Sequence, residues 1–345
     1  MRGRRNLVGI LVGVAAAAAA GWFLLPKLSE LGHTWTRVSS GRPGWLLLAV
    51  GLEVLSFAGY VGLFRAVFVR SGSRIGWRES YEITMAGLAA TRLLAAGGAG
   101  GVALTAWALK RSGMEGRTVA RRMTSFLVIL YGVYMAALVV FGVGLAVGLF
   151  PGSAPVGVTL VPAGFGALVI VAALSVSRLR GVTGIARAES ERALVRRARW
   201  LAHSVAAGVR GAIGLLRSRD PGLLGGLAWW GFDIGVLWSS FHAFGATPPI
   251  AVIVMAYFVG TLANTLPLPG GIGGVDGGMI GAFLAFGVAP GAAVIAVLTY
   301  RAIAFWLPTL PGAIAYLQLR RTMGEWQAEE ESAEPAVATA RIAAA

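Results

Sequence analysis

Long uninterrupted apolar runs dominate this 345-residue chain and limit what it can fold into. Residues 7–25 read LVGILVGVAAAAAAGWFLL, and residues 123–150 form a second run without a charged side chain. Each run can cross the hydrocarbon core of a bilayer as a helix, which takes about 20 residues. Hydrophobic residues make up 57% of the chain and charged residues 13%, about half the charged share of soluble domains. The sequence therefore predicts an all-α polytopic membrane protein.

The charged residues are mostly basic, and the formal net charge is +15. Such a charge can indicate nucleic-acid binding. Here the arginines cluster beside the apolar runs, as the positive-inside rule predicts for a membrane protein, so we expect no nucleic-acid partner. The chain contains no cysteine, which excludes disulfides and cysteine-ligated metal.

Basic residues at the ends of the apolar runs predict the topology. Arg2, Arg4 and Arg5 place the N-terminus in the cytoplasm. The run at 7–25 is longer than a signal-peptide core and ends in bulky residues, so we interpret it as an uncleaved first span. The charge pattern also predicts a cytoplasmic C-terminus and a multi-pass protein of the cell (cytoplasmic) membrane. Five further spans are expected at about 44–68, 123–149, 157–176, 222–244 and 289–316.

Two other apolar stretches, 81–111 and 249–288, are interrupted by glycine-rich sequence. The interruptions are GGAGG at 97–101 and LPLPGGIGGVDGG at 266–278. The halves of the first stretch are too short to span a bilayer, and both of its ends are basic. We therefore expect a re-entrant helical hairpin that enters and leaves on the cytoplasmic side. The parity of the spans then places a second re-entrant hairpin on the outer side.

The two interrupted stretches also resemble each other. GLAATRLLAAGGAGGV at 87–102 aligns without gaps on GTLANTLPLPGGIGGV at 260–275, an offset of 173 residues. Similar halves of opposite orientation, here about 44–176 and 222–317, are the inverted-repeat plan of many secondary transporters. Small residues can also serve close helix packing without any transport, although packing does not explain the two helix-breaking prolines. The predicted hairpin-loop residues are Gly97, Gly98, Gly100, Gly101, Pro267, Pro269, Gly270, Gly271, Gly273 and Gly274.

A basic segment at 177–221 joins the halves, and a polar tail follows at 322–345. Apolar residues recur in the segment at helical spacing with arginines between them, which indicates an amphipathic helix on the cytoplasmic leaflet. A solvated basic linker that only sets the topology is equally compatible. The tail is rich in glutamate and alanine and is predicted to be disordered, which leaves 1–321 as the transmembrane domain. The arginines expected to meet anionic inner-leaflet headgroups are Arg192, Arg196, Arg197 and Arg199.

Ionisable residues at membrane depth mark the candidate site, because each costs roughly 2.5–3.5 kcal/mol at a helix centre and requires a partner or a hydrated cavity. We expect Asp276 to pair with Arg301, since the second hairpin leads into the last span; the pair could be purely structural. In the functional interpretation, Arg92 and Arg301 bind a lipid phosphate while an acid contacts a cationic headgroup or balances the arginines. Arg65 and Glu82 are interpreted as snorkelling or topological residues. The candidate substrate-binding residues are Arg92, Asn264, Asp276, Arg301, Asp233 and Glu53.

The sequence offers little support for catalysis. Its histidines, His33, His203 and His242, are too scattered for a metal site. Neither a GxSxG nucleophile elbow nor an HExxH zinc motif is present. We therefore expect no enzymatic activity, no cofactor and no metal.

The run at 260–321 resembles the C-terminal half of the flippase-like transmembrane region of lysylphosphatidylglycerol synthases, which stand-alone YbhN-type membrane proteins share. The resemblance covers about residues 6–321 and is looser in the first half. This chain departs from the family pattern at Asp276, where glutamate is common, and in the first hairpin, where Ala95 or Ala96 replaces a proline. The residues that carry the resemblance are the loop Pro269 to Gly273, Asp276, Gly287-Val288 and Tyr300-Arg301.

The resemblance implies movement of a phospholipid, or of an aminoacylated phospholipid, between leaflets. The aminoacyl-transferring domain of full-length synthases is missing from this sequence, so the chain is not expected to make lysyl-lipid. Two alternatives come from other classes. One is a non-transporting membrane scaffold or lipid-binding partner of a biosynthetic enzyme, and the other is a transporter of small ions or metabolites. The lipid, the direction, the energy source and any homo-oligomer are left open by the sequence.

Overall fold

The computed structural model describes residues 41–69, 73–93, 99–178, 193–262, 273–306 and 308–343, and the regular structure in these ranges is helical. The α-helices are α2 Pro43–Phe68, α3 Trp77–Leu93, α4 Ala99–Arg111, α5 Gly116–Ala146, α6 Leu160–Arg178, α7 Ala193–Arg217, α8 Gly225–Ala243, α9 Ile250–Thr261, α10 Gly274–Ala285, α11 Pro290–Arg301 and α12 Thr309–Ala343. Short 3₁₀ turns precede α6 and α8 at Val156–Val158 and Pro221–Leu224.

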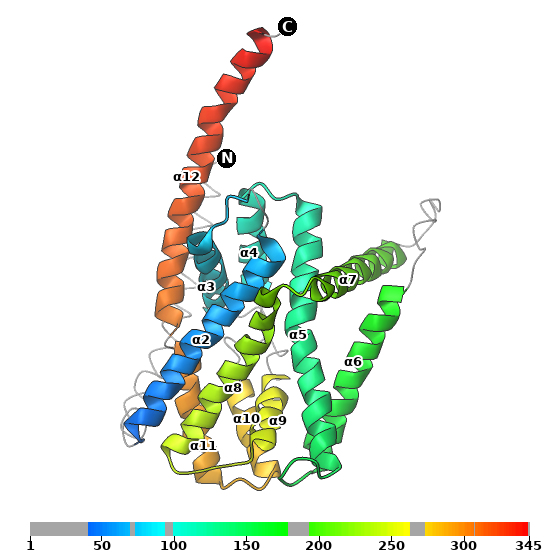
Figure 1. Ribbon diagram of the computed structural model, residues 1–345, viewed down its shortest axis with the longest axis vertical. Coiled ribbons are helices and arrows are strands. Elements are labelled where there is room, and N and C mark those ends of the chain that lie inside the picture. Colours follow the sequence, from blue (N-terminus) through cyan, green and yellow to red (C-terminus); the bar gives the residue numbers. More distant parts are fainter. Residues whose placement is uncertain are drawn as a thin grey trace.

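Four helical stretches among the described residues are long and apolar enough to cross a membrane, which confirms the all-α polytopic fold. They are α2, α5, the stretch Val156–Arg178 that contains α6, and the stretch Pro290–Glu329 that contains α11 and the first part of α12. The predicted span at 222–244 corresponds to α8, which lies beside α2 (Figure 1). The predicted first span, 7–25, lies outside the described residues. Six spans therefore remain a prediction.

Helices α2 and α8 form a closely packed antiparallel pair through the middle of the molecule (Figure 1). The amide of Arg42 at the start of α2 donates to the carbonyl of Ala243 at the end of α8, at 3.0 Å. Halfway along, Gly59 lies so close to α8 that a Cβ atom there would be 2.7 Å from the Cβ of Ala228. Glycine at this position therefore lets the two backbones approach, as small residues do between membrane helices.

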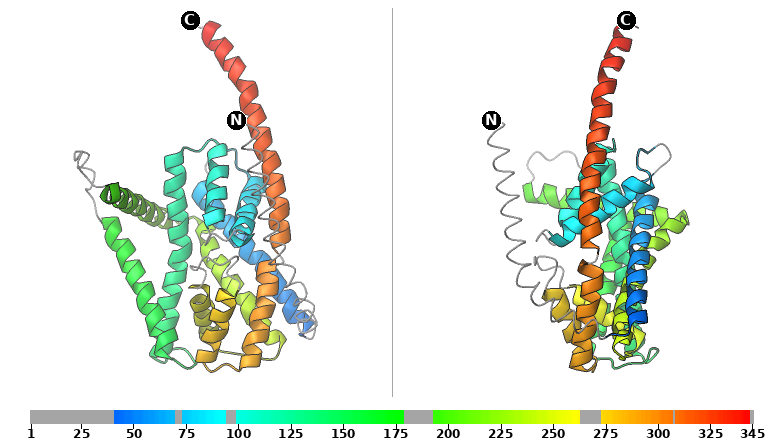
Figure 2. Two further views of the ribbon diagram at one scale, coloured as in Figure 1. Left: turned by 180° about the vertical axis from the view of Figure 1, so that it is seen from behind. Right: turned by 90° about the vertical axis from the view of Figure 1, so that its left-hand side faces the viewer.

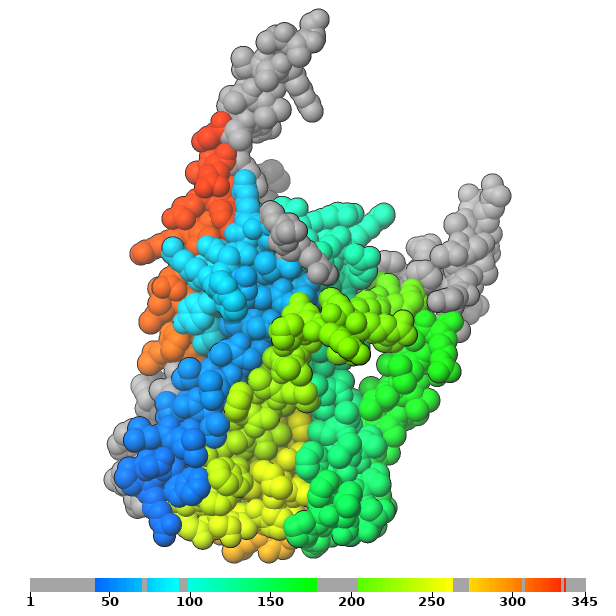
Figure 3. Space-filling view, viewed as in Figure 1, coloured from blue at the N-terminus to red at the C-terminus, as the bar shows by residue number. Residues whose placement is uncertain are grey.

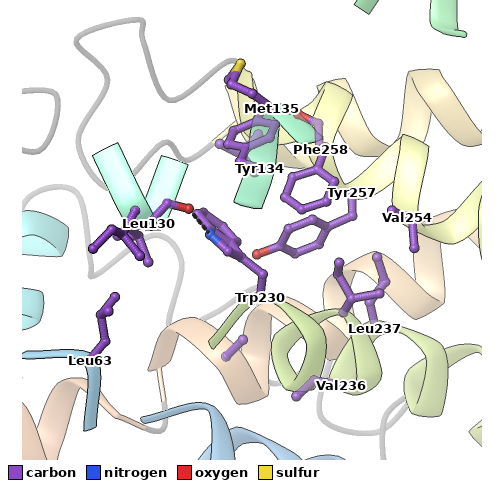
Figure 4. Packing of buried hydrophobic residues seen from close by; sticks show 14 of the residues in the cluster. Leu63, Leu130, Tyr134, Met135, Trp230, Val236, Leu237, Val254, Tyr257 and Phe258 are labelled. Carbon is purple, nitrogen blue, oxygen red and sulfur yellow. Dashed lines mark hydrogen bonds between the residues drawn. The ribbon is translucent and has the colours of Figure 1, made fainter. Parts of the chain in front are cut away.

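An aromatic cluster joins α5, α8 and α9 (Figure 4). The indole Nε1 of Trp230 donates to the carbonyl of Leu130 at 2.7 Å. Tyr134 stacks on Phe258 with 4.4 Å between ring centroids, and its hydroxyl donates to the carbonyl of Phe258. The polar ends of these buried rings are thus satisfied. The cluster fixes the position of α9, whose Tyr257 belongs to the site described below.

Two pairs of short helices lie at opposite ends of the molecule. Helices α3 and α4 lie toward the upper end in Figure 1 and α9 and α10 toward the lower end, as the view from behind in Figure 2 also shows. A Cβ atom on Gly101 would lie 2.4 Å from the carbonyl oxygen of Gly87, and one on Gly260 would lie 2.6 Å from the amide nitrogen of Met279. Each pair is therefore closed by a contact that only glycine permits.

The predicted hairpin loops fall mostly outside the described residues. This applies to Gly97, Gly98, Pro267, Pro269, Gly270 and Gly271. Gly100 and Gly101 belong to the first turn of α4, and Gly274 begins α10. Gly273, just before α10, has φ 83°, a left-handed conformation that favours glycine.

The predicted last span, 289–316, is interrupted in its middle. Helix α11 ends at Arg301, a π-helical turn follows at Ala302–Trp306, and α12 begins at Thr309. Pro308 cannot donate an amide hydrogen bond, so the regular ladder stops there. The hydroxyl of Thr309 instead donates to the carbonyl of Phe305, at 2.6 Å.

The prediction of a disordered tail at 322–345 is wrong for the described part, because α12 continues as a helix to Ala343. Thr322, Met323 and Trp326 are buried on one face of it. Alanine, glutamate and arginine are strong helix formers, so a segment of high polarity can continue a helix that is already anchored by packing. Figure 2 shows α12 passing α3 and projecting beyond the other helices.

The basic segment at 177–221 contains the predicted helix, α7. Its C-terminal half lies crosswise between the upper ends of α8 and α6 (Figure 3) and packs on α5. The hydroxyl of Ser125 in α5 donates to the carbonyl of Gly208, at 2.9 Å. Contact of α7 with a lipid leaflet stays a prediction. Of the predicted headgroup arginines, Arg196, Arg197 and Arg199 lie on α7 with side chains outside the description, and Arg192 lies outside the described residues.

Candidate functional site

Asp233, in the middle of α8, accepts hydrogen bonds from two phenols. The hydroxyl of Tyr300 on α11 donates to its Oδ2 at 2.9 Å, and the hydroxyl of Tyr257 on α9 donates to the same oxygen. The residue is only 8% exposed. A carboxylate at this depth requires such donors, and charge-assisted hydrogen bonds are the stronger kind. Three helices therefore converge on one acid.

Glu53 on α2 faces Asp233 across the contact between α2 and α8. The two carboxyl groups are within hydrogen-bonding range of each other. Glu53 is only 3% exposed, and its Oε2 makes no hydrogen bond with any described residue. Burying a polar atom without a partner costs about 1–3 kcal/mol. Packing alone therefore does not account for glutamate at this position.

Arg92, in the last turn of α3, brings a positive charge to the two acids. Its guanidinium interacts electrostatically with both Glu53 and Asp233. Its Nη1 donates to the carbonyl of Phe305 at 3.4 Å, and its Cζ lies 5.6 Å from the ring centroid of Phe57. Arg92, at the end of α3, thus places a positive charge beside the interrupted stretch between α11 and α12.

Asp276 and Arg301 form the ion pair that the sequence predicts. The Nε of Arg301 lies 2.6 Å from the Oδ1 of Asp276, and the amide of Gly273 donates to Oδ2 at 3.0 Å. The acid lies in the first turn of α10 and the base in the last turn of α11, so each charge complements a helix dipole. The pair therefore joins the second short helix pair to the last membrane stretch.

The two arginines approach the same aromatic ring. The Cζ atoms of Arg301 and Arg92 lie 4.7 Å and 5.7 Å from the ring centroid of Phe305, and the two guanidinium groups interact electrostatically. Arginine suits phosphate because its planar donors can bind two oxygens at once. Two guanidinium groups around one apolar ring can therefore hold a phosphate while the nearby acids balance their charge.

The structure thus brings together five of the six candidate residues. Glu53, Asp233 and Arg92 form one group, and Asp276 and Arg301 adjoin it through Phe305 and Tyr300. Asn264 lies outside the described residues, so its expected hydrogen bonds stay a prediction.

Three further site residues, Tyr257, Tyr300 and Phe305, are not predicted as ligands by the sequence. Tyr300 has a signal in hindsight, because it directly precedes Arg301 in the Tyr-Arg motif. Tyr257 and Phe305 lie in apolar runs where an aromatic residue is ordinary, and only the fold shows that they meet Asp233 and the arginines.

The interpretation of Glu82 as a snorkelling or topological residue is wrong, because its side chain is fully buried. Its Oε1 lies 2.8 Å from the Nε of Arg78, and its Oε2 accepts a hydrogen bond of 2.8 Å from the hydroxyl of Thr322. Glu82 therefore joins α12 to α3.

Arg65, the other residue interpreted as snorkelling or topological, also contacts α3. Its Nη1 donates to the hydroxyl of Ser80 at 3.0 Å, and its guanidinium stacks on the ring of Trp77.

In the described ranges, no group of three or more histidine, aspartate or glutamate side chains could hold a metal ion. The candidate site instead combines two guanidinium groups, three carboxyl groups and two phenols, which suits recognition of a charged group.

A family model described as the lysylphosphatidylglycerol synthase TM region matches residues 9–312 of the chain. The chain belongs to this family. As a member of the lysylphosphatidylglycerol synthase TM family with several apolar helices, it is a multi-pass membrane protein. The match includes both short helix pairs and all five gathered site residues.

Curated relatives carry the name UPF0104 membrane protein and come from Methanothermobacter thermautotrophicus. One alignment is 33% identical over 98 residues and covers 28% of this chain and 28% of the relative. Another is 36% identical over 87 residues and covers 25% of this chain and 26% of the relative. The alignments thus cover little more than a quarter of each of these two relatives. The name of the relatives is consistent with this chain being a stand-alone member of the family.

Proposed function

We propose that this chain translocates a phospholipid, or an aminoacylated phospholipid, between the leaflets of the cell membrane. The observation that carries the proposal is the placement of Arg92, at the end of α3, and Arg301, at the end of α11, around Phe305 and beside buried acids. A phospholipid headgroup presents the phosphate that such arginines bind. The acids can meet a cationic headgroup group or balance the arginines, and the acyl chains can stay in the bilayer.

We also propose that the two halves of the chain form an inverted repeat, which would support lipid translocation. Adding 173 to the residue numbers of α2, α3 and α4 gives 216–241, 250–266 and 272–284, which overlap α8, α9 and α10. The hydroxyl of Ser56 on α2 donates to the carbonyl of Trp229 on α8, and these residues are themselves 173 apart. Residues that touch their own equivalents lie near an axis that relates two repeats. Gly87 and Gly260, which close the two short helix pairs, are also 173 apart.

We further propose that the two short helix pairs are re-entrant hairpins that enter the bilayer from opposite sides. Their positions at opposite ends of the molecule support this arrangement, which in secondary transporters brings broken helices together near the midplane (Figure 1). Cysteine substitutions at Gly97 and Gly270 test it. An impermeant thiol reagent should reach them from opposite sides of the membrane, and labelling from the same side would refute opposed hairpins.

The basic helix α7 sets the orientation in this proposal. Its arginines would lie against the anionic cytoplasmic leaflet, and we propose that both termini lie in the cytoplasm. We also infer that the described part of the chain moves lipid rather than modifying it, because its site groups suit charge recognition and not bond cleavage.

Reconstituted liposomes test lipid translocation. The full chain is incorporated into vesicles with fluorescent phospholipids of several headgroups, and an impermeant reductant reports the outer-leaflet fraction. The wild type should expose most of the labelled lipid, whereas protein-free vesicles expose about half. Failure to move any headgroup would contradict the proposal and favour a scaffold or lipid-binding role.

Site variants test the phosphate assignment in the same assay. Arg301→Ala and Arg92→Ala should each slow lipid movement by at least about tenfold, since a hydrogen bond to a charged group contributes about 1.5–3 kcal/mol. Arg121→Ala is the matched control, because Arg121 is exposed on α5 away from the site. Equal rates for wild type and Arg301→Ala would show that the arginine is not a ligand.

A further inference from the structure

We infer that Glu53 determines headgroup specificity: it shares a proton with Asp233 and accepts a hydrogen bond from an N–H or O–H donor on the lipid headgroup. The inference rests on the proposed function, and it names the class of lipid that the same site selects. Lipids whose headgroup carries such a donor beyond the phosphate are accepted. Lipids with a quaternary ammonium, which has no donor, are rejected.

The two facing carboxyl groups hold a proton between them. Glu53 and Asp233 are both buried and lie within hydrogen-bonding range of each other. Two carboxyl groups this close in an apolar interior cannot both be ionised, so they share a proton. Tyr257 and Tyr300 already donate to Asp233, which stabilises the negative charge on that side. Glu53 is therefore the protonated member, and it donates to Asp233.

This bridge leaves Glu53 with an open acceptor. The proton occupies one oxygen of its carboxyl group, and apart from the bridge the described residues donate no hydrogen bond to Glu53. Arg92 interacts with Glu53 through its charge, and its Nη1 donates instead to the carbonyl of Phe305. A buried acceptor without a donor is unfavourable, so a ligand that supplies a donor here gains affinity.

The open acceptor lies next to an arginine of the proposed phosphate site. Phe57 follows Glu53 by one turn on the same face of α2, and the Cζ of Arg92 lies 5.6 Å from the ring centroid of Phe57. Phe57 and Arg92 are each half-buried, so this face of α2 is partly open. A phosphate bound by Arg92 would therefore hold the rest of its headgroup beside Glu53. Ethanolamine and glycerol headgroups carry their donors a short carbon bridge away from the phosphate.

A protonated acid does not require a cation as its partner. Its open oxygen is an uncharged acceptor, which bonds an ammonium N–H or a hydroxyl O–H alike. Choline has only methyl groups on its nitrogen, so it would press carbon atoms against this oxygen and leave it unpaired. A site that forms a hydrogen bond with its substrate discriminates strongly against an analogue without the donor, because the buried group is then left without a partner.

A methylation series of one lipid tests the donor. The full chain is reconstituted, and movement of fluorescent phosphatidylethanolamine is compared with that of its mono-, di- and trimethylated forms, the last being phosphatidylcholine. The forms that keep an N–H should move at similar rates, whereas the trimethylated lipid should be at least about tenfold slower. A gradual decline along the series, or equal rates throughout, would overturn the inference while lipid movement stands. No movement of any lipid would overturn the proposed function as well.

Phosphatidylglycerol separates the two kinds of donor, because its headgroup carries hydroxyls and no ammonium. It should move at the rate of phosphatidylethanolamine if the acceptor is uncharged. Movement as slow as that of phosphatidylcholine would overturn the uncharged acceptor, because an ammonium alone would then be recognised.

Variants of Glu53 assign the selectivity to this residue, and the readout is the ratio of the ethanolamine rate to the choline rate. In Glu53→Gln the amide donates to Asp233 and its oxygen stays an acceptor, so the ratio should persist. Glu53→Met has a similar shape without this acceptor and should bring the ratio close to one. Glu115→Met is the control, because Glu115 is exposed at the start of α5.

A merely structural role of Glu53 predicts a different result, because a damaged fold would slow both lipids alike and leave the ratio unchanged. An unchanged ratio in Glu53→Met, with its fold checked by thermal melting, would overturn the assignment. Loss of the ratio in Glu53→Gln would overturn it independently, since that result would require an ionised Glu53.

Discussion

A single methyl group at Gly59 tests the helix contact that holds Glu53 opposite Asp233. In Gly59→Ala the new Cβ would lie 2.7 Å from the Cβ of Ala228 and 3.1 Å from the carbonyl oxygen of Gly225. Relaxed carbon–carbon contacts are about 3.5–4.0 Å, so α2 and α8 must separate by about 1 Å. Overpacking of this kind costs about 1–3 kcal/mol. The separation should also weaken the contact between the two acids and slow lipid movement.

Gly51→Ala is the matched control for this prediction. Gly51 lies on the same helix, and a Cβ there would meet nothing within 4 Å. Both variants gain the same helix propensity, about 1 kcal/mol, so the difference between their unfolding midpoints isolates the strain. In thermal melts followed by tryptophan fluorescence, Gly59→Ala should unfold at least about 2 °C below Gly51→Ala. Equal midpoints would refute the close packing and the reasoning built on it.

The hydrogen bonds to Asp233 and to Glu82 can be tested by unfolding and proteolysis experiments. Tyr257→Phe and Tyr300→Phe each remove a phenol that donates to Asp233, and each should lower the free energy of unfolding by about 1.5–3 kcal/mol. An unchanged midpoint for both would mean that Asp233 does not depend on these donors. Thr322→Val leaves the buried Oε2 of Glu82 without its donor and should make α12 more sensitive to protease, whereas Thr322→Ser should not. Equal cleavage of the two variants would show that this hydrogen bond does not hold α12.

Hydropathy predicts the four described stretches that are long and apolar enough to cross a membrane, because lipid forces every backbone amide in a span into a helix and the length follows from bilayer thickness. The two interrupted stretches also have clear signals, since glycine and proline break apolar runs. The ion pair between Asp276 and Arg301 is predictable because the two residues lie on successive short helices, α10 and α11, that follow each other directly along the chain.

The remaining features depend on contacts that the sequence does not display. The polarity of the tail predicts disorder, yet Thr322 and Trp326 are buried on a helical face once α12 lies beside α3. In the sequence, Glu82 resembles a residue at a membrane interface. Only its contacts with Arg78 and Thr322 show that it is buried and joins α3 to α12. Tyr257 is ordinary in an apolar run until α9 packs against α8.

The most direct test of this account is whether a lipid phosphate reaches the buried arginines. Phosphatidylglycerol with a photoreactive group on its headgroup is incorporated with the full chain into liposomes, irradiated, and the adducts are mapped by mass spectrometry. The account predicts adducts in the last turn of α3, around Arg92, and in the stretch from Arg301 to Phe305. Adducts confined to lipid-facing positions such as Leu168 on α6, which is 67% exposed, would contradict it.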